Sequence, residues 1–378
     1  QIYRRVSHGL LNSSCSCLKG DHELKISVVM KDRFLRALNR QPVDKTPIWI
    51  MRQAGRYLPE YRATREKAGD FLALCKNPEL CCEVTMQPLQ RFDLDAAIIF
   101  SDILTIPDSM GLGLSLQEKI GPVFSRPIKS FNEIKALPIP DPEKDLGYVM
   151  EAIRLSKKAL NDKVPLIGFA GSPWTLAAYM VEGAGSRDFA KIKKLAYGNQ
   201  EAIHMLLGKL TESVTLYLEA QISAGADAIM IFDSWGGILS TDAYEIFSLH
   251  YMRTIVQNLT KYKIPTILFT KGGGLWLESI GDTQCTAVGL DWTTDISIAK
   301  KLIGGKVALQ GNLDPAIMLT TPQIVAEEAK KILDKFGLGS GHIFNLGHGI
   351  TPEVPPENVE ALVSTVHSYS QKFHGQES

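Results

Sequence analysis

Eight short apolar runs recur along this chain of 378 residues, and they limit its possible folds more than any other feature. Each run is a nearly continuous stretch of β-branched and apolar residues, without the alternation typical of a strand with one face in water. The runs span residues 47–51, 96–100, 165–169, 228–232, 266–269, 287–290, 307–309 and 343–346. Strands of this kind need cover on both faces, so the chain between them is expected to supply helices.

Helical patterns do lie between these runs. Apolar residues at steps of three and four over 203–222 predict an amphipathic helix that stops near Gly225. Thr321 as the N-cap and Pro322 in the first turn predict another helix, which ends before Gly337. Strands and helices therefore alternate, as in βα units.

Eight βα units without a Pro/Gly/Ser-rich linker favour one closed α/β barrel, the (β/α)8 TIM barrel, over two doubly wound domains. Residues 26–378 are predicted to form this barrel as a single catalytic domain. The longest insertion follows the second run. Within it, residues 111–121 partly alternate apolar and polar side chains, which predicts a hairpin that decorates the barrel.

Composition and charge exclude several classes of protein. Forty-one Lys and Arg residues balance 41 Asp and Glu, which argues against a nucleic-acid partner but allows a local basic pocket. No apolar stretch approaches the roughly 20 residues of a membrane span. Six cysteines without a C-x-x-C or His-x-Cys pair predict no metal site. The glycine-rich stretches form neither a P-loop nor a G-x-G-x-x-G motif, so nucleotide binding is not expected.

The first residues differ from the rest. Residues 1–20 contain no acidic side chain, carry Arg4, Arg5 and Lys19, and are rich in serine. This composition is typical of an organelle transit peptide or its remnant. We therefore predict that residues 1–25 form a flexible N-terminal segment outside the folded domain. A disordered cytosolic tail is the alternative.

Two arginines follow the first apolar run within one loop. In a barrel the catalytic residues lie just past the C-terminal ends of strands. Arg52 and Arg56 occupy that position, and guanidinium groups hold carboxylates or phosphates through paired hydrogen bonds. Salt bridges with Glu60 and Glu66 on a solvated face are the alternative. The placement at a pocket mouth favours an anionic ligand.

Four further polar residues lie at or near strand ends. Asp102 ends an otherwise apolar stretch, where it could bind a cation or N–H groups, act as an acid or base, or merely cap the next helix. His348 lies between two glycines, and because a histidine ordinarily titrates near neutral pH it is a candidate for proton transfer. Tyr179 sits in an apolar patch typical of a buried phenol. Ser234 lacks the G-x-S-x-G elbow of a serine nucleophile.

Five motifs resemble the signatures of the uroporphyrinogen decarboxylase family. They are MRQAGRYLPE at 51–60, FSDIL at 100–104, GSPWT at 171–175, YMVEG at 179–183 and NLGHG at 345–349. The resemblance covers about residues 28–370 and implies a single (β/α)8 barrel, usually a homodimer. It also implies removal of the four acetate carboxyl groups of uroporphyrinogen III, giving coproporphyrinogen III for haem and chlorophyll synthesis. No metal or organic cofactor is implied.

The resemblance assigns roles to residues of one cleft. Substrate contacts are implied for Arg52, Ala54, Arg56, Arg65, Asp102, Tyr179, Ser234 and His348. Catalytic roles are implied for Arg52, Asp102, Tyr179 and His348. In this scheme Asp102 accepts hydrogen bonds from pyrrole N–H groups and stabilises positive charge on the ring. The proton donor stays open between His348, Tyr179, a substrate carboxylic acid and an arginine.

Other functions remain to be weighed. Cobalamin-linked methyltransferases share this barrel, but those that resemble the chain bind zinc through a His-x-Cys pair that is lacking here. A Schiff-base lyase would use Lys271, and a tetrapyrrole carrier would bind without releasing CO2. The N-terminal composition together with the pathway points to a plastid, with the cytosol as the alternative.

Overall fold

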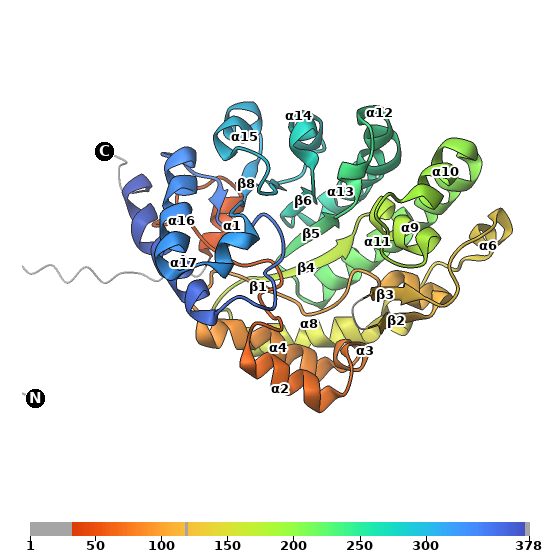
Figure 1. The fold of residues 1–378 in the computed structure, drawn as a ribbon, viewed down its shortest axis with the longest axis horizontal. Coiled ribbons are helices and arrows are strands. Elements are labelled where there is room, and N and C mark those ends of the chain that lie inside the picture. The colour runs from red at the N-terminus through yellow and green to blue at the C-terminus, as the bar shows by residue number, and fades with distance from the viewer. Residues whose placement is uncertain (1–31, 118–119, 375–378) are drawn as a thin grey trace, which may run out of the picture.

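The computed structural model describes residues 32–117 and 120–374 (Figure 1). The predicted N-terminal segment, residues 1–25, lies outside the described residues. In the described part of the chain no helix is both long enough and apolar enough to cross a membrane.

A curled parallel sheet of seven strands forms the centre of the molecule, in the order β1-β4-β5-β6-β7-β8-β9. The strands are β1 (Ala97–Ile98), β4 (Leu166–Gly171), β5 (Ala228–Asp233), β6 (Thr266–Thr270), β7 (Ala287–Gly289), β8 (Ala308–Gln310) and β9 (His342–Ile343). Every residue of β4, β5 and β6 is buried, as the continuous apolar runs predict for strands covered on both faces. The sheet is that of a TIM-like barrel.

The first predicted strand, at 47–51, is reduced to a single bridge. Ile48 pairs with Phe344 in parallel, and its carbonyl accepts a 2.8 Å hydrogen bond from the Asp95 N–H. The segment therefore lies between β9 and the chain that leads into β1. It does not continue as a strand, because a side chain occupies a backbone hydrogen-bond donor that a strand pair would need: the Ile50 N–H donates to Gln53 Oε1 at 3.1 Å.

Helices surround the sheet on its outer side (Figure 1). The first half of the chain contains α1 (Arg33–Leu38), α2 (Pro59–Ala68), α3 (Phe71–Cys75), α4 (Pro78–Arg91), α5 (Thr105–Pro107), α6 (Phe131–Ala136), α7 (Pro142–Asp145), α8 (Gly147–Leu160) and α9 (Pro173–Glu182). The second half contains α10 (Ala190–Gly198), α11 (Gln200–Ala224), α12 (Thr241–Tyr244), α13 (His250–Leu259), α14 (Leu277–Gly281), α15 (Ile296–Ile303), α16 (Pro322–Phe336) and α17 (Pro356–Ser370).

Both helices predicted from apolar spacing are present. Helix α11 ends at Gly225, whose φ of +122° suits a residue without a side chain. Helix α16 begins where predicted, because the Thr321 side chain accepts a 3.4 Å hydrogen bond from the Ile324 N–H. Between β1 and β4, the strands β2 (Leu114–Gln117) and β3 (Gly121–Phe124) pair antiparallel.

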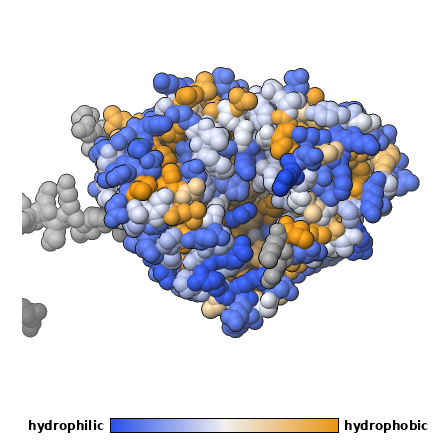
Figure 2. All heavy atoms as spheres, in the orientation of Figure 1, coloured by the Kyte–Doolittle hydropathy of each residue, from blue (hydrophilic) through white to orange (hydrophobic). Residues whose placement is uncertain are grey.

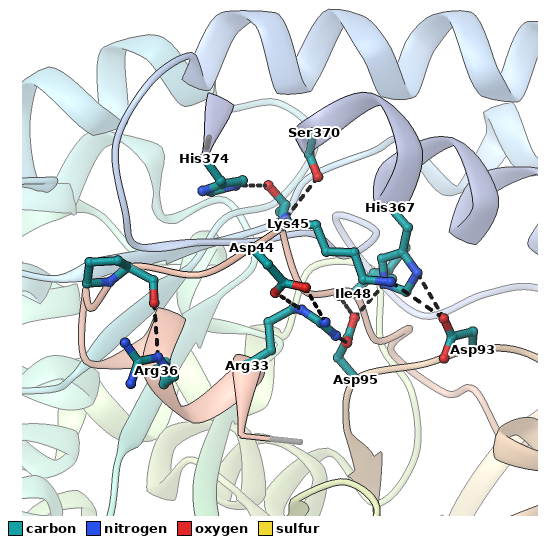
Figure 3. Close-up of polar contacts among 12 residues, drawn as sticks. Arg33, Arg36, Asp44, Lys45, Ile48, Asp93, Asp95, His367, Ser370 and His374 are labelled. Atoms are coloured by element: carbon teal, nitrogen blue, oxygen red, sulfur yellow. Dashed lines mark hydrogen bonds and ion pairs between the residues drawn. The ribbon is translucent and has the colours of Figure 1, made fainter. Parts of the chain in front are cut away.

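A buried ionic network at the N-terminal side of β1 joins both ends of the described chain (Figure 3). Asp95 accepts hydrogen bonds from Arg33 of α1, from the Ile48 N–H at 2.8 Å and from His367 Nε2 of α17 at 2.7 Å. Arg33 also binds both carboxylate oxygens of Asp44, at 2.6 and 2.7 Å. Satisfied charges of this kind hold α1 and α17 against the start of β1. The loops that follow the C-terminal ends of the strands lie at the opposite end of the sheet.

Candidate functional site

The arginine loop is fixed against the loop that carries the predicted histidine. The Met51 N–H donates to Asn345 Oδ1 at 2.9 Å, and the Ile350 N–H donates to the Met51 carbonyl at 3.0 Å. Arg52, the next residue, is exposed and has a φ of +65°, in the left-handed region. Such a conformation in a non-glycine residue persists only where its surroundings hold it. The hydrogen bonds of Met51 therefore fix the backbone from which the Arg52 side chain extends.

Asp102 lies past the end of β1 and is partly buried. Its Oδ1 accepts a 2.7 Å hydrogen bond from the Leu104 N–H, so one oxygen performs the capping role that was the simpler prediction. Its Oδ2 accepts no hydrogen bond from the described residues. Burial raises the pKa of Asp102, while the Leu104 N–H and the positive charge of Arg52 lower it. Asp102 and Arg52 therefore lie within electrostatic reach of each other.

Tyr179 is on α9, near the same two groups. The helix starts just past β4, where the Ser172 side chain accepts a 3.1 Å hydrogen bond from the Thr175 N–H. Burial raises the pKa of Tyr179, as does the negative charge of Asp102, whereas the nearby Trp235 side chain and the charge of Arg52 lower it. The phenol is therefore protonated at neutral pH and can donate a hydrogen bond.

His348 follows β9 and is partly buried, with its ring centroid 6.1 Å from that of Phe269. Burial lowers the pKa of His348 to about 4, helped by the positive charges of Arg52 and Lys271, and Asp291 opposes this only in part. In the free protein the imidazole is therefore neutral at pH 7. Arg52, Asp102, Tyr179 and His348 are brought together, since the charge of Arg52 acts on the other three.

The remaining predicted arginines are not neutralised by the acidic residues first considered. Glu60 pairs instead with Arg91, at 2.9 Å. Among the described residues no carboxylate lies within 4.0 Å of Arg52, Arg56 or Arg65. Arg65 is partly buried, and its Nη1 is fully buried without a hydrogen-bond partner. An unsatisfied buried N–H of a cation is costly, so this group suits an anionic ligand.

Ala54 and Ser234 are the two remaining residues predicted to contact the substrate. Ala54 is partly buried and packs its methyl group against the apolar cluster beneath the arginine loop. Ser234 is partly buried and follows β5 immediately. No recorded hydrogen bond joins either of them, or Arg56, to Asp102 within the part of the chain described.

Asp233, the last residue of β5, was not predicted as a site residue. It is fully buried, and its carboxylate accepts hydrogen bonds from four hydroxyls. These come from Ser172 at 2.7 Å, Thr175 at 2.9 Å, Ser248 at 2.7 Å and Thr270 at 3.4 Å. Burial raises the pKa of Asp233, and the four hydroxyls lower it. The carboxylate ties together the ends of β4, β5 and β6, and Ser234 is the next residue in the sequence.

Trp235 is held by this same network. Its N–H donates to Thr175 Oγ1 at 3.1 Å, and its carbonyl accepts from Trp174 Nε1 at 3.1 Å. Its ring lies edge-on to Tyr179, with centroids 6.0 Å apart. Asp233 therefore positions two aromatic rings of the site through Thr175. The apolar run before Asp233 indicates that this residue lies at the end of a strand. The hydroxyl partners of Asp233 lie far apart in the sequence, so the network could not be predicted from it.

The surface of the molecule is hollowed in more than one place. Figure 2 shows a hollow near the middle of the face in view, with hydrophobic atoms inside it and hydrophilic side chains around it. A second groove, of about 770 Å³, lies between α11 and α13 and includes none of the predicted site residues. No group of three or more His, Cys, Asp or Glu side chains able to hold a metal ion occurs among residues 32–117 and 120–374.

Comparison with known proteins gives consistent results. The protein-family model described as "Uroporphyrinogen decarboxylase (URO-D)" matches residues 30–369. A uroporphyrinogen decarboxylase of Pseudoalteromonas atlantica is 60% identical over 347 residues, covering 91% of this chain and 98% of the relative. One of Pseudomonas savastanoi is 58% identical over 353 residues, covering 92% and 100%. Both relatives are bacterial.

Among solved structures, a methyltransferase from Methanosarcina mazei superposes with a TM-score of 0.76 at 22% identity, covering 89% of this chain and 97% of its own. A B12-independent methionine synthase from Shewanella superposes with a TM-score of 0.53 at 14% identity, covering 89% and 97%. At these identities the likeness concerns the fold alone.

Proposed function

This chain belongs to the uroporphyrinogen decarboxylase family of carboxy-lyases, and we propose that it converts the four acetate side chains of uroporphyrinogen III into methyl groups. Decarboxylation in tetrapyrrole biosynthesis follows from the family. The product would be coproporphyrinogen III, which serves haem and chlorophyll synthesis. One observation carries the proposal: the partly buried Asp102 carboxylate has one oxygen held by the Leu104 N–H at 2.7 Å and the other without a hydrogen-bond partner among the described residues.

The proposed chemistry uses the substrate as its own electron sink. A proton adds to a pyrrole ring carbon, the bond between the acetate CH₂ and its carboxylate breaks, and the electron pair moves into the cationic ring as CO₂ leaves. A second proton then adds to the exocyclic CH₂, and the ring carbon loses the first. Each acetate thus takes up one proton and releases one CO₂, so no cofactor is required.

Asp102 is proposed as the main electrostatic catalyst. Its Oδ1 is fixed by the Leu104 N–H, which leaves Oδ2 free to accept hydrogen bonds from pyrrole N–H groups. A carboxylate removed from bulk water stabilises a developing cation more strongly than an exposed one does. Because the charge appears on the ring during the reaction, this stabilisation favours the transition state over the bound substrate.

The arginines are proposed to hold the substrate's carboxylates. Arg52 and Arg56 on the loop, and Arg65 with its unpaired Nη1, have no acidic partner within 4.0 Å among the residues described, so their charges are available to a ligand. Ala54, Tyr179, Ser234 and His348 would complete the contact surface. His348 is neutral at pH 7 in the free protein, so as a proton donor it would first need its pKa raised by the bound carboxylates.

The experiment is an anaerobic incubation of the metal-stripped protein with uroporphyrinogen III, followed by oxidation and separation of the porphyrins by carboxyl count. Products stepping from eight carboxyls to four are expected. Unchanged substrate, with the protein shown to be folded, would favour the tetrapyrrole carrier. Turnover of the substrate that depends on added zinc would favour a methyltransferase-like site.

Three further properties belong to the proposal. Residues 47–51, the first predicted strand, would close the barrel between β9 and β1, supported by the single Ile48–Phe344 bridge. A homodimer and a plastid location are carried by the resemblance and by the N-terminal composition. Sedimentation of the purified chain tests the homodimer, and a monomer would contradict it. Fluorescence of a chain fused at its C-terminus tests the plastid location, with a cytosolic signal as the contrary result.

A further inference from the structure

Lys271 is held rigidly at the end of β6. Its N–H donates to the Asp233 carbonyl at 3.2 Å, and the next residue, Gly272, donates its N–H to the Asp291 carboxylate. Gly272 has a φ of +78°, which turns the chain sharply past the strand. The backbone of Lys271 is therefore anchored on both sides, to the strands that carry the candidate site.

The ammonium group of Lys271 lies between two indole rings. Its Nζ is 5.9 Å from the ring centroid of Trp235 and 5.8 Å from that of Trp292. Aromatic faces attract a cation without neutralising it. Within the described ranges no carboxylate lies within 4.0 Å of this ammonium, whereas Lys157 pairs with Asp227 at 2.7 Å. Lys271 is thus partly buried and without a carboxylate partner among these residues.

This charge lies near His348, as does the charge of Arg52 on the arginine loop. Arg52 and Lys271 both lower the pKa of His348, although they come from opposite parts of the sequence, before α2 and after β6. Trp235, which flanks Lys271, also contacts Tyr179. His348 therefore has a cation near it from a second loop, besides Arg52 of the arginine loop.

We propose that Lys271 is a substrate-binding residue, whose ammonium binds an alkyl carboxylate of the tetrapyrrole while Trp235 and Trp292 hold its side chain in place. This inference rests on the proposed function. A lysine ammonium carries three donors on a flexible stem, so it can follow a carboxylate whose position shifts as the substrate changes. The Schiff-base role considered from the sequence would instead need a neutral amine and a substrate carbonyl carbon.

The test compares Lys271→Met, Lys271→Arg and, as the matched control, Lys330→Met. Lys330 is exposed on α16 and lies 5.3 Å from the Tyr369 ring, so the control also removes a cation next to an aromatic ring. We expect Lys271→Met to raise KM for uroporphyrinogen III about tenfold, with a smaller change in kcat, because an anchoring charge contributes to binding. Lys271→Arg should recover most of the loss, and Lys330→Met should behave as wild type.

A second measurement identifies the carboxylate. Anaerobic binding of coproporphyrinogen III, which has lost its acetates, is followed by tryptophan fluorescence. Weaker product binding in Lys271→Met would assign a propionate to Lys271, and unchanged product binding with a raised KM would assign an acetate. Either supports the inference.

The inference would be overturned by a KM within twofold of wild type in Lys271→Met, or by a substrate adduct on Lys271 after borohydride treatment. Both outcomes are read against the wild-type enzyme. If wild type releases no CO₂, the proposed function fails, and anaerobic binding of uroporphyrinogen III, followed by the same tryptophan fluorescence in wild type and Lys271→Met, then decides whether Lys271 binds a carboxylate of the tetrapyrrole.

Discussion

Gly349 packs directly against the side chain of Arg52, so that a Cβ added at position 349 would lie 2.8 Å from both Cγ and Nε of the arginine. Real Cβ contacts are longer than this. Gly349, one residue before the Ile350 N–H that donates to the Met51 carbonyl, therefore creates the space in which Arg52 lies, and the NLGHG and MRQAGR motifs form one structural unit. The spacing in sequence, nearly the whole length of the barrel, hides this relationship.

The substitution Gly349→Ala should displace Arg52 without unfolding the protein. We expect KM for uroporphyrinogen III to rise about tenfold, as for the loss of one charged hydrogen bond of roughly 1.5 to 3 kcal/mol. Steady-state kinetics measures this. Gly208→Ala is the matched control, because no atom lies within 4 Å of its added Cβ, and it should leave KM unchanged. A normal KM in Gly349→Ala would separate Arg52 from substrate binding.

Replacing Asp102 by Asn should leave the fold intact and lower kcat by about 100-fold or more. The amide oxygen can still accept the Leu104 N–H, but the negative charge that stabilises the cationic ring is lost. Initial rates of CO₂ release test this, with Asp242→Asn, an exposed aspartate of α12, as the control. Turnover close to wild type would remove Asp102 from the mechanism.

Asp233→Ala should lower the free energy of unfolding by roughly 2 to 4 kcal/mol, because it leaves buried hydroxyl donors without their charged acceptor. Urea unfolding measures the change. The exposed Asp242→Ala should cost far less. If Asp233→Ala unfolds at the wild-type urea concentration, the hydroxyl network does not stabilise the ends of β4, β5 and β6 as described.

His342 should make stability depend on pH. Burial lowers the pKa of His342 to about 4 from its ordinary value of 6.5, although its Nε2 donates to the Gly311 carbonyl at 2.9 Å. Between these values the unfolded chain binds a proton that the folded chain does not. The free energy of unfolding therefore falls as pH falls through this window, by about 2 kcal/mol from this residue at pH 5.

The measurement is urea unfolding at pH 7.5 and pH 5. His342→Gln keeps a donor for Gly311 and cannot take up a proton, so it should lose less stability than wild type between the two pH values. His250→Gln, at an exposed position, controls for the loss of a histidine. Equal losses in wild type and His342→Gln would contradict this assignment.

The sequence pattern predicted the inner strands and long helices well, because their signals are local. Residues 228–232 and 266–269 fall within β5 and β6, since continuous apolar runs become buried strands. The run at 47–51 looked the same, but Gln53 takes the backbone N–H of Ile50 and leaves only the bridge at Ile48. A competing side-chain hydrogen bond of this kind cannot be read from hydrophobicity.

The site was predictable where a motif carried it and hidden where distant partners did. Arg52 lies within electrostatic reach of Asp102, Tyr179 and His348, although the roles of these four residues stay predictions. The salt bridges considered for the arginine loop were wrong, because Glu60 pairs with Arg91. Asp233 was not predicted as a site residue, because its four hydroxyl partners come from separate elements.

The bond between the Met51 N–H and Asn345 spans 294 residues, and that between Ile48 and Asp95 is reinforced by His367 of the last long helix. During synthesis on the ribosome the arginine loop therefore emerges early but cannot take its final shape until nearly all of the chain has followed. Contacts so far apart in sequence slow folding, because the intervening loop must be closed first. A translation product that stops before residue 345 would lack the partner that fixes Arg52, and so would carry every arginine of the loop without a working pocket.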